Sequence, residues 1–163
     1  ILQFKAFYSR VGVKDTGEAD CWGRNYSGQA DPPDGTFSWV SSSLYHTCGL
    51  RTDGTVICWG CEYLPEGVDY KQCLPPSGEF LQIESGIYHS CGLREGGVVE
   101  CWGCNHPDGA IDFGQCDVPD GVYTHVSAGN YHTCGVLSDG YLVCWGYQDR
   151  DGDSADFGQC SPP

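Results

Sequence analysis

The chain has little positive charge and no methionine. Its 163 residues carry 8 Lys and Arg against 22 Asp and Glu, a formal net charge of −14. Without a basic surface to displace the counterions of phosphate groups, nucleic acid is excluded as a partner. An anionic membrane surface is disfavoured for the same reason. The sequence also has no apolar run near the roughly 18 residues that span a bilayer, so we expect no membrane partner.

Stretches that favour a helix are scarce as well, whereas Gly contributes 24 residues, about double its usual share. This composition excludes a helical bundle and predicts short strands joined by turns. The 12 Cys in an acidic chain predict an oxidising, extracellular location, where disulfides persist. The chain begins at Ile1 without an apolar leader, which we interpret as a mature or trimmed chain. The sequon Asn25-Tyr26-Ser27 predicts a glycan on Asn25 and agrees with secretion.

Four internal repeats organise the chain. The segment 48–60 recurs at 91–103 and 134–146, each step being 43 residues, and a degraded copy lies at 11–23. The repeats also share a glutamine, at Gln29, Gln72, Gln115 and Gln159. We therefore expect one repeat domain over 1–163, with repeats near 1–37, 38–80, 81–123 and 124–163.

Each repeat is predicted to be all-β. One strand opens near 82–83 and 125–126, a second covers 45–50 and its copies, and a third ends in Cys-Trp-Gly. A tight turn at Asp53-Gly54 joins the second strand to the third. Repeats near 40 residues with about four strands each are typical of propeller blades.

The cysteines are predicted to form two kinds of disulfide. In each hairpin two Cys are equidistant from the turn, so they lie opposite each other: Cys48–Cys58, Cys91–Cys101 and Cys134–Cys144. A second pair brackets the loop after Trp-Gly in repeats two and three: Cys61–Cys73 and Cys104–Cys116. Cys21 and Cys160 remain, in the first and last repeats. They pair either within one chain, closing a ring of four, or between two chains, completing a ring of eight; the sequence leaves both open.

Three other patterns have a structural interpretation. His46, His89 and His132 stand at one repeat position, which favours a hydrogen bond between strands over a metal site. Cys-x-x-Cys at 58–61 and 101–104 is typical of zinc or redox sites, but repeat four keeps the hairpin pair without it. The acidic segment 149–156 lacks the Gly and Glu of a calcium loop, so we expect no metal. No catalytic motif is present, and we predict a protein that is not an enzyme.

The repeat pattern resembles a known family. Gly-x-Tyr-His-Thr-Cys-Gly-Leu-x-x-Asp-Gly-x-Val-x-Cys-Trp-Gly, then Gly-Gln and a Pro-Gly turn, is similar to the regulator of chromosome condensation repeat in a cysteine-bearing variety, over nearly the whole chain. The resemblance implies a β-propeller, usually of seven blades. Four repeats then imply a small ring, or an arc that a second subunit completes.

Aromatic residues divide into repeating and non-repeating sets. The repeating set, interpreted as blade core, is Trp22, Trp59, Trp102 and Trp145 with Tyr8, Tyr45, Tyr88 and Tyr131. Phe4, Phe7 and Trp39 break the pattern, which indicates burial against something that their counterparts do not meet.

The sequence supports two hypotheses for the function. The first is a secreted protein that holds an elongated apolar ligand of carotenoid type against Phe4, Phe7 and Trp39, at the seam of an incomplete ring or of a dimer with a similar chain. Cysteine-rich repeats with non-repeating aromatics resemble marine-invertebrate carotenoproteins built on this repeat. The alternative is a secreted protein-interaction module or enzyme inhibitor that uses the loops 61–73, 104–116 and 147–160. Tyr63 and Tyr147 are then its candidate anchors.

Overall fold

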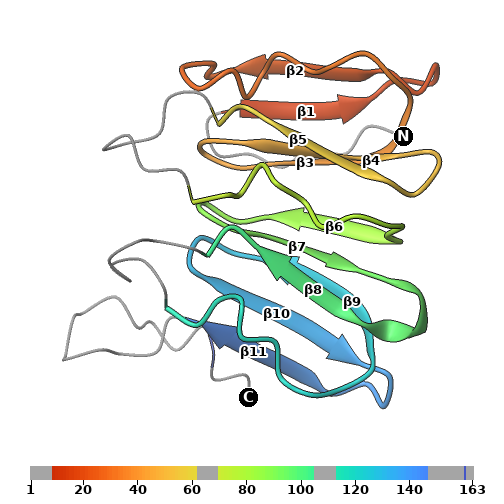
Figure 1. Ribbon diagram of the computed structural model, residues 1–163, viewed down its shortest axis with the longest axis vertical. Helices are drawn as coiled ribbons and strands as arrows, with labels where there is room; N and C mark the ends of the chain where they lie inside the picture. The colour runs from red at the N-terminus through yellow and green to blue at the C-terminus, as the bar shows by residue number, and fades with distance from the viewer. Residues whose placement is uncertain (1–8, 62–69, 105–112, 147–159, 161–163) are drawn as a thin grey trace.

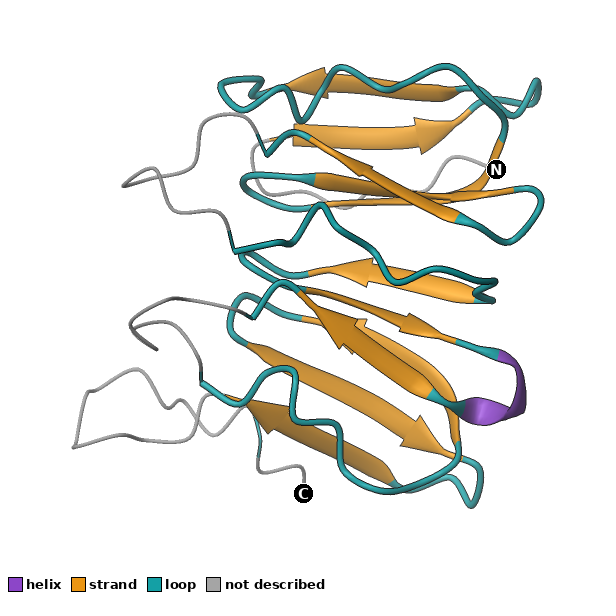
Figure 2. Cartoon of the chain, in the orientation of Figure 1, coloured by secondary structure: helices purple, strands orange, loops and turns teal. Residues whose placement is uncertain are grey.

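The structure is a computed structural model, in which we describe residues 9–61, 70–104, 113–146 and 160 (Figure 1). The all-β architecture expected from the sequence is confirmed in this part of the chain, where the one helical turn is a 3-10 turn, η2, at Glu95–Gly97 (Figure 2). The strands are β1 (Ser9–Val13), β2 (Ala19–Gly23), β3 (Phe37–Ser42), β4 (Thr47–Arg51), β5 (Val56–Trp59), β6 (Gln82–Ser85), β7 (Ser90–Leu93), β8 (Val99–Trp102), β9 (Tyr123–Ala128), β10 (His132–Leu137) and β11 (Leu142–Gly146).

The strands form four small antiparallel sheets, which succeed one another along the molecule (Figure 1). We call them blades: blade 1 is β1-β2, blade 2 is β3-β4-β5, blade 3 is β6-β7-β8 and blade 4 is β9-β10-β11. The first strands of blades 2, 3 and 4 lie next to one another, because β3 contacts β6 and β6 contacts β9. This arrangement is that of propeller blades around an axis.

The blades have fewer strands than the repeat length predicts. About four strands were expected in each, whereas the described residues form three in blades 2 to 4 and two in blade 1. The chain between β5 and β6 contains the Cys61–Cys73 disulfide and the turn at Pro75-Pro76. Proline has no N–H to donate to a sheet, so the Pro-rich stretch disfavours an outer strand there.

The hairpin turns explain why the second and third strands stay in register. In blade 2 the carboxylate of Asp53 accepts hydrogen bonds from the backbone N–H and the hydroxyl of Thr55, at 2.9 and 2.6 Å. Gly54 adopts φ +84°, a left-handed conformation that side chains disfavour. Cys48 then lies directly opposite Cys58. The predicted Asp-Gly turn is therefore what aligns the two thiols.

All five disulfides that join the repeating cysteines are present. The cross-strand pairs Cys48–Cys58, Cys91–Cys101 and Cys134–Cys144 each have a Cα–Cα distance of 4.0 Å. The loop pairs Cys61–Cys73 and Cys104–Cys116 each have a Cα–Cα distance of 6.2 Å. The first kind fastens a hairpin, and the second ties the start of a loop to its end.

Cys21 and Cys160 do not form the ring-closing bond within the chain that the sequence left open. Both carry thiols in the structure. Cys21 lies opposite Val11 and packs into the apolar cluster between blades 1 and 2, and burial raises the pKa of its thiol to about 12. The Cys160 thiol donates to the Gly146 carbonyl at 3.1 Å. Pairing of Cys21 with any other cysteine would require it to leave that apolar cluster.

The hydrophobic core is divided among three seams between consecutive blades. The first contains Val11, Phe37, Val40 and Trp59. The second contains Cys48, Leu50, Phe80, Ile83 and Trp102, and the third Cys91, Leu93, Tyr123, Val126 and Trp145. In each seam one blade supplies a hairpin, which is β1-β2, β4-β5 or β7-β8. The next blade supplies a Trp, a second aromatic ring and an aliphatic side chain. A blade therefore buries its apolar surface only against its neighbours.

Candidate functional site

The repeated histidines tie one blade to the next. His46 is fully buried, and its Nε2 forms a 2.8 Å hydrogen bond with the hydroxyl of Ser90 in blade 3. His89 repeats the contact 43 residues later, with the Thr133 hydroxyl of blade 4 at 3.0 Å. The hydrogen-bonding role predicted for the repeated histidines is confirmed for His46 and His89, and the bond joins neighbouring blades.

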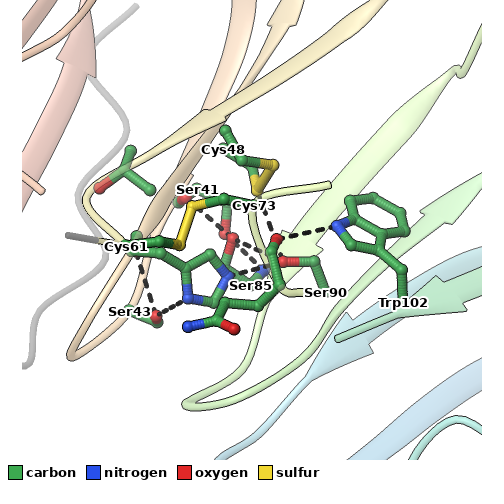
Figure 3. The surroundings of a disulfide bond; sticks show 12 residues. Ser41, Ser43, Cys48, Cys61, Cys73, Ser85, Ser90 and Trp102 are labelled. Atoms are coloured by element: carbon green, nitrogen blue, oxygen red, sulfur yellow. Dashed lines mark hydrogen bonds between the residues drawn. A yellow bond between two sulfur atoms is a disulfide. The ribbon is translucent and has the colours of Figure 1, made fainter. Parts of the chain in front are cut away.

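A second hydrogen bond, which we call the clasp, joins each of blades 2 to 4 to the preceding repeat. The indole N–H of Trp59, Trp102 and Trp145 donates to the carbonyl of Gln29, Gln72 and Gln115 respectively, at 3.0 to 3.1 Å. Figure 3 shows Trp102 in this setting, near the Cys61–Cys73 disulfide, Ser85 and Ser90. The glycine after the Trp has φ +91° at Gly60, and a Cβ there would lie 2.5 Å from Gln29 Cα. The Trp-Gly pair is therefore needed for the clasp.

A row of tyrosines lies at one end of the blades. Tyr45, Tyr88 and Tyr131 each occupy the turn between the first and second strand of their blade. This is the loop end, on the left of Figure 1, where the loops after Trp-Gly also start. The rings of Tyr45 and Tyr88 stack with centroids 5.5 Å apart, and those of Tyr88 and Tyr131 are 6.0 Å apart. We call these three residues, with Tyr26, the tyrosine row.

A buried tyrosine packs against the tyrosine row, and an arginine lies at one end of it. Tyr70, which is buried, packs 4.9 Å from the Tyr88 ring. The guanidinium of Arg24 lies 5.3 Å from the ring of Tyr26 and 5.9 Å from that of Tyr45. Burial, then the neighbouring Tyr45, raises the pKa of Tyr88 well above its usual value, so the phenol stays neutral. The row is thus an ordered, partly exposed aromatic strip.

The interpretation of all repeating aromatics as blade core is wrong for Tyr45, Tyr88 and Tyr131 and for Trp22, which is 39% exposed. Tyr8 lies outside the described residues. The tryptophans of blades 2 to 4 are buried, at 5–9% exposure, whereas Tyr45, Tyr88 and Tyr131 are half-buried. The difference arises because the tryptophans lie on strands between blades and the tyrosines lie in turns at the end of the blades. Repeat spacing identifies equivalent positions, but it does not say which of them face a neighbouring blade.

Blade 4 exposes a face that is buried in the other blades. We call the side of a blade that packs on the next one its outgoing face. In blade 3 this face consists of His89, Cys91, Leu93 and Val99, all at most 8% exposed. The equivalent residues of blade 4 are His132, Cys134, Val136 and Leu142, all half-buried or exposed, with Leu142 at 48%. No described residue forms a further blade against them.

The other side of blade 1 is more exposed than the corresponding side of blades 2 to 4. We call the side that receives the preceding blade the incoming face, and in blades 2 to 4 it is marked by the buried Trp59, Trp102 and Trp145. The equivalent Trp22 is 39% exposed. Arg10 and Asp20, which flank it in the strand register, are exposed too. Among the described residues, the outgoing face of blade 4 and the incoming face of blade 1 are therefore the more exposed ones.

Among the predicted ligand-binding residues, Trp39 is the one that the structure describes. Its ring is half-buried against the second seam, next to the cluster that contains Ile83 and Trp102. The equivalent Gln82 reaches across the third seam, where its amide contacts the backbone of Val126. Trp39 thus packs between two blades of its own chain. The other predicted residues, Phe4, Phe7, Tyr63 and Tyr147, lie outside the described residues, as does the acidic segment 149–156.

At the opposite, turn end, a cleft of about 620 Å³ separates blades 2 and 3. Its lining is mixed in charge and includes Arg51, Asp53 and Glu95. Its aromatic member, Phe80, is covered by the Arg94 guanidinium, 3.8 Å from the ring centroid. The cleft therefore presents charged side chains beside apolar ones such as Leu50 and Leu81.

Asn25, the predicted glycosylation site, is exposed, and its amide nitrogen lies 2.9 Å from each carboxylate oxygen of Asp31. Within the described ranges no three His, Cys, Asp or Glu side chains gather in a way that could hold a metal ion. The same part of the chain has no helix of the length and apolarity needed to cross a membrane.

Comparison of the sequence with family models gives one match. The model described as the regulator of chromosome condensation (RCC1) repeat matches residues 40–63, 80–115 and 123–152, more than half of the chain. No curated protein sequence matches the chain.

Solved structures of similar fold include two receptor ectodomains. The ectodomain of the receptor kinase ACR4 from Arabidopsis thaliana is 28% identical with a TM-score of 0.64, and the match covers 87% of this chain and 48% of that one. The ectodomain of the receptor kinase CR4 from Physcomitrella patens is 25% identical with a TM-score of 0.67, covering 90% and 42%. Prp20p from Saccharomyces cerevisiae, described with its binding to Gsp1p and histones, is 16% identical with a TM-score of 0.67, covering 85% and 43%. The chain thus spans about half the length of these proteins.

Proposed function

The chain belongs to the regulator of chromosome condensation (RCC1) repeat family, and on that basis we propose that it is an extracellular, non-enzymatic module that recognises a protein partner. The five disulfides and the likeness to receptor ectodomains are consistent with an extracellular location. Secretion and a glycan on Asn25 are part of the proposal.

The tyrosine row is the observation that carries this function. Tyr and Arg are enriched at the energetic centres of protein interfaces. Tyr buries a large area at low cost in side-chain entropy, and Arg supplies several hydrogen-bond donors. Here the rings are held by mutual stacking and by Tyr70 beneath them, so little order is lost on binding. Arg24 adds a donor beside the exposed ring of Tyr26, which is 78% exposed. The predicted anchors Tyr63 and Tyr147 belong to loops that leave from the same end.

The test is affinity capture with matched variants. The chain with Tyr26→Ser and Tyr45→Ser and the unchanged chain are immobilised, and proteins retained from the extracellular fluid of the source are identified by mass spectrometry. Tyr141→Ser is the control, because Tyr141 is 72% exposed but lies at the turn end. We expect one protein to be retained by the unchanged chain and the control and lost with the row variant. Equal recovery on all three would refute recognition by the row.

A second candidate is the binding of an elongated apolar ligand of carotenoid type at an open seam, in a dimer with a similar chain. Half-buried Val136 and exposed Leu142 on the outgoing face of blade 4 favour it. An absorption spectrum and native mass spectrometry of the protein from its source test this idea. Visible absorbance with a few hundred daltons of added mass, lost in Leu142→Asp, would support it. A colourless chain without added mass would contradict it.

A further inference from the structure

We propose that the cleft between blades 2 and 3 is a second recognition surface, which binds a segment of a protein partner that carries lysine or arginine next to apolar residues. The cleft lies at the turn end, between two blades from the middle of the chain. Its volume of about 620 Å³ is in the range of pockets that hold ligands. The proposal goes beyond the proposed function and does not depend on the tyrosine row.

The walls of the cleft combine aliphatic and acidic side chains. Leu50 and Leu81 line it, and Leu81 is 65% exposed. The carboxylates come from Asp53, Glu79 and Glu95, all exposed, and Glu95 begins the turn η2 on the right of Figure 2. Lysine and arginine have the matching composition, because their hydrocarbon stems pack on apolar surface while their charged heads stay at its polar edge.

Glu79 and Glu95 stand at two repeat positions that are neighbours in blade 2. There the positions hold Thr36 and Thr52, whose hydroxyls form a 3.0 Å hydrogen bond. Blade 3 thus has two like charges where blade 2 has a pair of hydroxyls. Among the described residues, no side chain forms an ion pair or a hydrogen bond with either carboxylate. A cation bound between the two carboxylates would offset their repulsion.

The two arginines in the lining do not supply that cation. Arg94 is held by the carboxylate of Glu100 at 2.8 Å and donates to the backbone carbonyl of Glu79 at 3.1 Å. The guanidinium of Arg51 lies 5.7 Å from the ring centroid of Phe37. Phe37 packs in the first seam, between blades 1 and 2, and does not line this cleft. A cation for the acidic wall therefore comes from a partner.

The charge of the whole chain favours the same kind of partner. A formal net charge of −14 attracts a basic segment and repels an acidic one before contact. The cleft then distinguishes among basic segments, because its aliphatic wall stabilises those that carry apolar residues next to the cation.

The test is the binding of a labelled peptide to the full chain, followed by fluorescence anisotropy. The probe is fluorescein-labelled Lys-Leu-Lys-Leu-Lys-Leu, and Lys-Ser-Lys-Ser-Lys-Ser is the matched peptide without apolar side chains. We expect the leucine peptide to bind, and the serine peptide to bind at least about threefold more weakly. The affinity for both should fall as the salt concentration is raised.

Matched variants assign the binding to the cleft. Glu79→Gln combined with Glu95→Gln removes the two carboxylates and should weaken the leucine peptide at least about tenfold. Asp20→Asn combined with Asp117→Asn is the control, because it changes the net charge equally at exposed residues outside the cleft. Circular dichroism verifies that both variants are folded. In the labelled chain, NMR amide shifts on peptide binding should concentrate at residues 50–54 and 79–81.

Several results would overturn the proposal. They are the absence of binding at peptide concentrations up to about 1 mM, equal binding of the two peptides, equal weakening in the control variant, and amide shifts that lie outside the cleft. The chain with Tyr26→Ser and Tyr45→Ser should bind the leucine peptide as the unchanged chain does. Loss of binding in that variant would place the peptide on the tyrosine row and would also overturn the proposal, so the two recognition surfaces are tested separately.

Discussion

Blades 3 and 4 present the same repeat positions to opposite environments. His89, Cys91 and Val99 of blade 3 are buried against blade 4, whereas His132, Cys134 and Leu142 of blade 4 are half-buried or exposed. The local structure is the same in both, since each has a cross-strand disulfide with a Cα–Cα distance of 4.0 Å and the same strand order. A blade's core is therefore made by its neighbour and not by the blade itself. Residues at one repeat position are core where another blade packs on them and surface where none does.

The largest expected difference in the free energy of unfolding is between replacing a buried tryptophan and replacing the exposed Trp22. Trp102→Ala removes a ring packed 5.8 Å from Phe80 and breaks the hydrogen bond to the Gln72 carbonyl, so we expect a loss of about 3–5 kcal/mol in the free energy of unfolding. Trp22→Ala should cost under about 1 kcal/mol where the chain is monomeric. Urea unfolding with intact disulfides, followed by circular dichroism, measures both. Equal costs would mean that the incoming face of blade 1 is covered.

Replacing the histidines of blades 3 and 4 should give a similar but smaller difference in the free energy of unfolding. His89→Ala removes the 3.0 Å hydrogen bond to the buried Thr133 hydroxyl of blade 4, which then keeps only its bond to the Gln115 carbonyl. We expect a cost of about 1–3 kcal/mol in unfolding free energy. His132→Ala should change that free energy by less than about 0.5 kcal/mol in the monomer. Matched urea titrations compare the two. A large cost at His132 in a chain shown to be monomeric would remove the distinction between blades 3 and 4.

The three cross-strand disulfides should differ in their resistance to reduction. Cys48 and Cys91 are fully buried, whereas Cys134 is half-buried on the open face, so a reductant reaches it more easily. Under a limiting amount of reductant we expect Cys134–Cys144 to open before Cys48–Cys58 and Cys91–Cys101. Alkylation of the released thiols and peptide mapping at successive times give the order. Reduction of all three at one rate would indicate global unfolding as the route.

The smallest effect is a pH dependence at His132. Partial burial lowers the pKa of His132 from its usual 6.5. The unfolded chain then binds the proton more tightly than the folded one, so the contribution of His132 to stability is lost as the pH falls below about 6.5. NMR titration of the imidazole measures the shift, and His132→Gln should remove this part of the pH dependence. A pKa at or above 6.5 in the folded monomer would contradict the assignment.

The sequence predicted the features that recur in each repeat, but it did not predict those that depend on which blades or loops pack against a residue. The Cys48–Cys58 spacing around Asp53-Gly54 predicted the disulfide, because a hairpin turn determines which residues face each other. Strand number was overestimated, since repeat length does not distinguish an outer strand from the disulfide loop between Cys61 and Cys73.

The candidate site was harder to predict for the same reason. Trp39 was expected to mark a ligand because its counterparts Gln82 and His125 are polar, but it fills the seam between blades 2 and 3. Tyr45, Tyr88 and Tyr131 were interpreted as core, although their position in a turn could have indicated the end of a blade. Cys21 was expected to pair, yet its neighbour Val11 already shows that this hairpin has an apolar contact where the others have a disulfide.

The clasp between Gln72 and Trp102 has a consequence for how the repeats can be rearranged. The segment that fastens blade 3 belongs to the preceding repeat, and the same holds for Gln29 with Trp59 and Gln115 with Trp145. A repeat that is excised at its sequence boundary therefore keeps the glutamine carbonyl that binds the Trp of the next blade, and loses the one that binds its own Trp. A single repeat should therefore be inserted, deleted or exchanged successfully only when the chain is cut before the glutamine of the preceding repeat. The unit that can be exchanged then begins earlier in the sequence than the sheet that it forms.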